Sequence, residues 1–111
     1  MLSHVDTQLG LTHAGGYLPL YLRFLSRFPE DDSLPGLIAA LERGDVREAF
    51  LCAHALKGLC AQLGIMDLSQ AASGVCELLR PLDPVALPEA RERMQALCAL
   101  HGQVCQELSA L

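Results

Sequence analysis

A stretch near the middle of the chain, residues 46–63, carries the clearest structural pattern in the sequence. Its apolar residues recur at intervals of three and four, which is the spacing of a helix face packed on a core. The members of this stripe are Val46, Ala49, Ala53, Leu56, Cys60 and Leu63. Asp45 precedes the stretch as a predicted N-cap, and Gly64 follows it as a predicted C-terminal stop. The pattern predicts a long amphipathic helix with one buried face.

The rest of the chain repeats this helical periodicity, and glycines and prolines divide it into further helices. Asp67 and Gln70 have the spacing of a capping box at the start of one of them. The expected helices are a short one from about Val5 to Gly10, then residues 17–28, about 35–43, 46–63, 67–80 and 87–108. No stretch has the alternating pattern of a strand, so the predicted fold class is all-α.

Length, charge and cysteine content narrow the range of functions. A chain of 111 residues is expected to form a single domain, residues 1–111. The net charge of −5 and the lack of a basic cluster argue against nucleic acid as a partner. The apolar runs are too short to span a membrane. Five cysteines within helical patterns favour reduced thiols and a cytoplasmic location. No additional apolar face is evident, which favours a monomer.

The most distinctive chemical group in the central helix is His54. It lies about 120° from the middle of the apolar stripe, so it is expected to be exposed. Lys57, the only lysine among eight basic residues, follows one turn later and can reach the same surface. Gly58 leaves that surface bare, although a glycine in mid-helix costs about 1 kcal/mol relative to alanine. A neutral imidazole is nucleophilic near pH 7 and can be phosphorylated. The spacing alone fits a phosphoryl-carrying histidine and an ordinary surface histidine equally well.

Two motifs relate the chain to a known family. Residues 53–64, AHALKGLCAQLG, resemble the signature of histidine-containing phosphotransfer (HPt) domains, and Gly10–Phe28, GLTHAGGYLPLYLRFLSRF, resembles a run found in HPt domains of bacterial hybrid sensor kinases. The resemblance implies an antiparallel up-down four-helix bundle with one or two short additional N-terminal helices. It also implies that His54 is the phospho-acceptor, Lys57 its charge partner and Gly58 the source of clearance.

One position departs from the HPt pattern. The family often has Glu or Gln on the next helix, oriented toward the imidazole, where this chain has Cys76 with Glu77 beside it. The sequence therefore leaves open which side chain orients the His54 ring.

The resemblance further implies a phosphorelay intermediate in two-component signalling. His54 would accept a phosphoryl group from the phospho-aspartate of a response-regulator receiver domain, or of a hybrid sensor histidine kinase, and pass it to another receiver. The chain has no motif for an ATP site, so we expect a carrier rather than a kinase. No cofactor is expected on it, and Mg²⁺ is expected on the receiver. The expected docking rim consists of Phe50, Leu51, Gly58, Ala61 and Ile65, with Arg47 as a further contact.

Two alternative functions remain at this level. One is a helical adaptor that is never phosphorylated. The other is a metal-binding helical bundle, because Cys98, His101 and Cys105 share one helix face. The same three positions also belong to the apolar stripe of the last helix, so a role in the core is the preferred interpretation. His4 and His13 are expected to be solvated.

Overall fold

The computed structural model describes residues 2–111, and within them all regular secondary structure is helical. The all-α prediction is therefore confirmed for this part of the chain. The α-helices are α1 (Thr7–His13), α2 (Leu18–Arg27), α3 (Ser33–Glu42), α4 (Val46–Leu63), α5 (Met66–Leu79) and α6 (Leu87–Leu108); short 3₁₀ turns, η1 (Phe28–Glu30) and η2 (Pro84–Ala86), precede α3 and α6.

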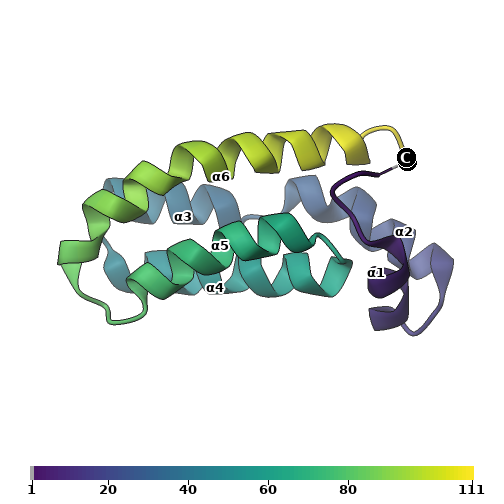
Figure 1. The fold of residues 1–111 in the computed structure, drawn as a ribbon, viewed down its shortest axis with the longest axis horizontal. Coiled ribbons are helices and arrows are strands. Elements are labelled where there is room, and N and C mark those ends of the chain that lie inside the picture. The colour runs from purple at the N-terminus through teal and green to yellow at the C-terminus, as the bar shows by residue number, and fades with distance from the viewer. Residues whose placement is uncertain (1) are drawn as a thin grey trace.

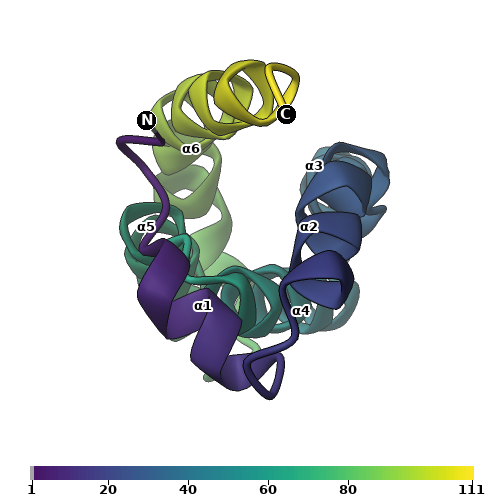
Figure 2. The same ribbon diagram turned by 90° about the vertical axis from the view of Figure 1, so that its right-hand side faces the viewer.

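The longer helices lie lengthwise and surround a common core (Figure 1, Figure 2). α4 packs against α3 on one side and α5 on the other, and α6 packs against α5 and α3. α1 and α2 lie at the end of the molecule where α4 finishes (Figure 1). The central helix α4 therefore contacts neighbours along most of its length and has one face left for solvent.

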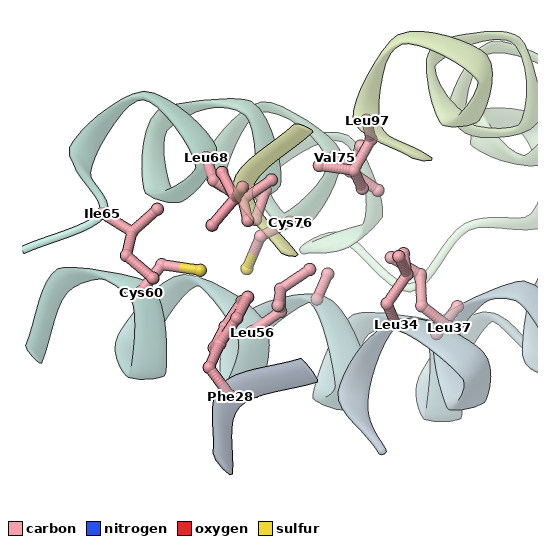
Figure 3. Packing of buried hydrophobic residues seen from close by; sticks show 14 of the residues in the cluster. Phe28, Leu34, Leu37, Leu56, Cys60, Ile65, Leu68, Val75, Cys76 and Leu97 are labelled. Atoms are coloured by element: carbon pink, nitrogen blue, oxygen red, sulfur yellow. The ribbon is translucent and has the colours of Figure 1, made fainter. Parts of the chain in front are cut away.

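The core follows the apolar periodicity of the helices. All six residues of the α4 stripe are buried, as predicted. They meet large apolar side chains from the neighbouring elements, including Phe28, Leu37, Leu68 and Leu97 (Figure 3). Removing such side chains from water is the main force that holds amphipathic helices together.

Both predicted ends of α4 are confirmed by their capping geometry. The Asp45 carboxylate accepts a hydrogen bond from the backbone N–H of Glu48 at 3.0 Å, which satisfies one of the free donors of the first turn. Gly64 ends the helix in the left-handed conformation, with φ of 82°. A side chain at Gly64 would also overlap with the backbone of Asp6, because the N-terminal segment crosses there.

The prediction for the first helix was right about its start, where Asp6 is the N-cap and accepts from the backbone N–H of Leu9 at 3.0 Å, and wrong about its end. α1 begins at Thr7 and continues through Gly10 to His13. A side chain at Gly10 would overlap with the Tyr21 ring and with the backbone carbonyl of Leu63. This glycine therefore marks a close crossing of helices and not the end of one.

The start of α5 also differs from the prediction. The helix begins at Met66, and its N-cap residue, Ile65, makes no side-chain capping bond. The Asp67 carboxylate instead accepts from the backbone N–H of Leu68 at 2.8 Å and binds the ring of His4 at 2.6 Å. The predicted capping box between Asp67 and Gln70 is therefore wrong, because the Asp67 carboxylate binds His4, a residue distant in sequence.

Candidate functional site

The imidazole of His54 lies on the exposed face of α4. The neighbouring stripe residues Ala53 and Leu56 are buried in the core, so the helix itself fixes the direction in which His54 points. No hydrogen bond from the ring is found within residues 2–111. The ring is thus open to a partner from solvent.

The next turn of α4 presents Lys57 and Gly58. Lys57 is half-buried, and its backbone carbonyl accepts a hydrogen bond from the buried hydroxyl of Ser69 at 3.0 Å, which ties this turn to α5. Gly58 is exposed, and a Cβ built there would meet nothing within 4 Å. The chain's own packing therefore does not require a glycine at this position, and the surface beside His54 is open.

The turn before His54 carries Phe50, which is half-buried. The centroids of the Phe50 and His54 rings are 6.0 Å apart, and their planes are tilted by 47°. The guanidinium of Arg80, at the end of α5, lies 5.4 Å from the centroid of the Phe50 ring. The site thus contains an aromatic pair on α4 and a cation from α5.

Arg80 is held by Glu77, one turn earlier on α5. Its guanidinium donates to the two carboxylate oxygens of Glu77 at 2.8 Å and 3.0 Å. These hydrogen bonds hold the pKa of the Glu77 carboxyl below its usual value, and the positive charges of Arg80 and Lys57 act in the same direction. The sequence pattern does not single out Arg80, because α5 must first pack on α4 before the residue reaches Phe50.

The side chain of Cys76 points into the core. It is 0% exposed and lies among apolar side chains (Figure 3). Burial raises the pKa of the Cys76 thiol, so the thiol stays protonated near neutral pH. Cys76 therefore does not replace the Glu or Gln that the HPt pattern places beside the imidazole.

The predicted docking residues do not all reach the surface. Leu51 is exposed, and Phe50 and Ala61 are half-buried. Ile65 is 0% exposed, which contradicts its predicted place on an exposed rim. It lies in the tight turn from α4 to α5, where its side chain faces the core (Figure 3). Arg47 is exposed in the first turn of α4, two turns from His54.

His101 and Cys105, two of the three candidate metal ligands, are half-buried and contact other side chains of this chain. His101 is half-buried, 5.4 Å from the Phe28 ring centroid, and burial lowers its pKa. The Sγ atom of Cys105 lies 3.6 Å from Nδ1 of His101. Across residues 2–111, no three His, Cys, Asp or Glu side chains come together in a way that could hold a metal ion.

The two N-terminal histidines have different surroundings. His13 is exposed, and its Nδ1 lies 3.1 Å from the backbone carbonyl oxygen of Gln62. His4 is half-buried between Asp67 and Glu107. His4 is therefore only partly solvated, because its ring lies against two carboxylates.

Comparison with known proteins assigns the family. Residues 20–110 match the family model described as Hpt domain, and the protein therefore belongs to the Hpt domain family. Members of this family act in histidine phosphotransfer within phosphorelays, together with receiver domains and histidine kinases. Neither curated proteins nor solved structures gave a match. In the described part of the chain, no helix has the length and apolarity needed to cross a membrane.

Proposed function

We propose that this protein is a phosphorelay intermediate in which His54 accepts a phosphoryl group from one receiver domain and passes it to another. The observation that carries the proposal is the exposed imidazole beside an open surface, with Lys57 one turn away, in a chain of the Hpt family. A second protein must reach the histidine for transfer to occur, and the bare turn at Gly58 leaves space for it.

The transfer reaction needs only a nucleophile and a counter-charge from this chain. A ring nitrogen of neutral His54 attacks the phosphorus of an aspartyl phosphate, forming the N–P bond. The P–O bond to the aspartate breaks, and its electron pair returns to the carboxylate. The ring proton stays on the other nitrogen. The Lys57 ammonium partly offsets the phosphoryl charge, and the receiver supplies Mg²⁺.

The rest of the chain serves as a rigid support for this residue. We propose that α3–α6 form an antiparallel up-down four-helix bundle, with α1 and α2 as the additional N-terminal helices. Residues 1–111 would act as one cytoplasmic, monomeric domain that carries phosphoryl groups without hydrolysing ATP. Its docking surface would comprise Phe50, Leu51, Lys57, Gly58 and Ala61, with Arg47 at the edge.

A transfer assay tests the proposal directly. The purified protein is mixed with a panel of radiolabelled phospho-receiver domains, and label on the protein is followed with time. We expect at least one receiver to transfer label and His54→Gln to abolish it while the circular dichroism spectrum is retained. Lys57→Ala is expected to slow transfer about tenfold through loss of the counter-charge.

The matched control is His13→Gln, which removes another exposed histidine and is expected to accept label normally. Label that persists on His54→Gln would place the phosphoryl group elsewhere. A folded wild-type protein that binds receivers without accepting label would be a helical adaptor.

A further inference from the structure

We propose that Phe50 is the positioning residue for the His54 imidazole, and that Arg80, held by Glu77, keeps Phe50 in place. This inference rests on the proposed function of His54 and identifies what orients its ring. The contact of Phe50 with both His54 and the Arg80 guanidinium carries it.

An exposed imidazole needs such a support if it is to react efficiently. Rotation about its two side-chain torsions points the ring nitrogens in several directions, and only some of them place a lone pair in line with an incoming phosphorus. No hydrogen bond within residues 2–111 limits this rotation. The side chain at the position that often carries Glu or Gln, Cys76, is buried and points away from solvent.

Helix geometry brings Phe50 against His54. Side chains on an α-helix lean toward its N-terminus, so His54 is directed over the residue four positions earlier. The centroid distance of 6.0 Å and the tilt of 47° lie within the range of favourable aromatic pairs.

Phe50 is itself restrained from the neighbouring helix. Arg80 lies 5.4 Å from its ring centroid, within the range of a cation–π contact. The bidentate hydrogen bonds to Glu77 fix the plane of the guanidinium and offset its charge. We therefore assign Arg80 a role in holding the Phe50 ring by contact.

The first measurement concerns the ring alone. In NMR spectra, we expect NOE contacts between the His54 and Phe50 rings and a ring-current shift of the His54 ring protons. Phe50→Leu should remove the shift and Phe50→Tyr should retain it. Arg80→Ala should weaken both signals, because Phe50 is no longer held.

The second measurement concerns reactivity. Phosphoramidate is a small phosphoryl donor that needs no docking surface, and phosphorylation of His54 can be followed by ³¹P NMR. We expect Phe50→Leu to slow this reaction about three- to tenfold and Phe50→Tyr to restore it, because the contact that orients the ring is worth that much in rate.

Two control variants match these changes. Phe24→Leu removes an aromatic side chain of α2 that is 44% exposed. Arg93→Ala breaks the ion pair between Arg93 and Glu89, whose side chains are about as exposed as those of Arg80 and Glu77. Neither should change the His54 signals or the rate. If Phe50→Leu leaves both unchanged in a protein that phosphoramidate does phosphorylate, the positioning role is wrong and the proposed function stands. If the wild-type protein accepts phosphate from neither phosphoramidate nor receivers, the proposed function fails, and the NMR contacts still decide whether Phe50 orients the ring.

Discussion

At the scale of single residues, the surface next to His54 depends on one missing side chain. Gly58 lies in the middle of α4, where alanine would stabilise the helix, and the space around it is open. Gly102 on α6 is also exposed, and a Cβ added there would likewise meet no atom within 4 Å. Of these two glycines, only Gly58 lies one turn from His54. Substitutions at the two positions therefore separate the effect on helix stability from the effect on the open surface beside His54.

We predict that Gly58→Ala raises the free energy of unfolding by about 0.5–1 kcal/mol, measured by urea denaturation. Gly58→Gln should also be stable, but should slow transfer from a receiver about tenfold or more, because its side chain occupies the docking surface. The receiver-free reaction with phosphoramidate should change little.

Gly102→Gln provides the comparison, with a similar gain in helix propensity and no effect on transfer. Equal transfer rates for Gly58→Gln and Gly102→Gln would show that clearance at Gly58 is not needed.

At the scale of elements, the C-terminal end of α4 is held by a buried hydrogen bond. The Tyr21 hydroxyl donates to the backbone carbonyl of Leu63 at 2.7 Å, and the backbone N–H of Asp6 donates to the carbonyl of Gly64 at the same distance. Burial raises the pKa of Tyr21, so its hydroxyl remains a donor throughout the neutral range. These bonds satisfy carbonyls that the end of a helix leaves free and join α1 and α2 to the bundle.

We predict that Tyr21→Phe lowers the free energy of unfolding by about 1–2 kcal/mol, because the Leu63 carbonyl loses its donor in a buried place. Chemical denaturation monitored by circular dichroism measures the change. Tyr17→Phe removes the hydroxyl of a residue that is 63% exposed and should change stability by less than about 0.5 kcal/mol. Equal effects of the two substitutions would contradict a structural role for the Tyr21 bond.

At the scale of the whole molecule, His4 connects the N-terminal segment to α5 and α6. Its Nδ1 lies 2.6 Å from Asp67, and its Nε2 lies 3.5 Å from Glu107. The hydrogen bond with Asp67 raises the pKa of His4 above its usual 6.5, aided by the charges of both carboxylates. Hydrogen bonds from Ser3 and His4 lower the pKa of Glu107 below its usual 4.5.

These shifts determine how stability depends on pH. The contribution of protonated His4 is complete below pH 6.5 and is lost as the pH rises through its higher folded pKa. The contribution of Glu107 is present above pH 4.5 and is lost as the pH falls through its lower folded pKa. We predict a melting temperature that declines as the pH rises above about 6.5, with a loss of about 0.5–1 kcal/mol from the His4 contact.

His4→Gln should flatten this decline in thermal melts, whereas His13→Gln should leave it unchanged. A decline that is the same in His4→Gln and in the wild-type protein would assign the pH dependence to other groups.

The local features of the central helix α4 follow from the sequence alone. The apolar stripe of α4, its cap at Asp45 and its stop at Gly64 depend on residues within a few positions of one another, so their pattern predicts the helix correctly. The exposure of His54 follows from the same periodicity, and the motifs at residues 10–28 and 53–64 indicated the Hpt family that the family match confirms.

Only the tertiary structure decided which residues from different helices meet. Ile65 was expected on the docking rim but is buried by the turn into α5, and the Asp67 carboxylate binds the His4 ring instead of capping its own helix. Arg80 reaches Phe50 only because α5 packs beside α4. The physical reason is that helix formation depends on neighbours in the chain, whereas burial and side-chain pairing depend on neighbours in space.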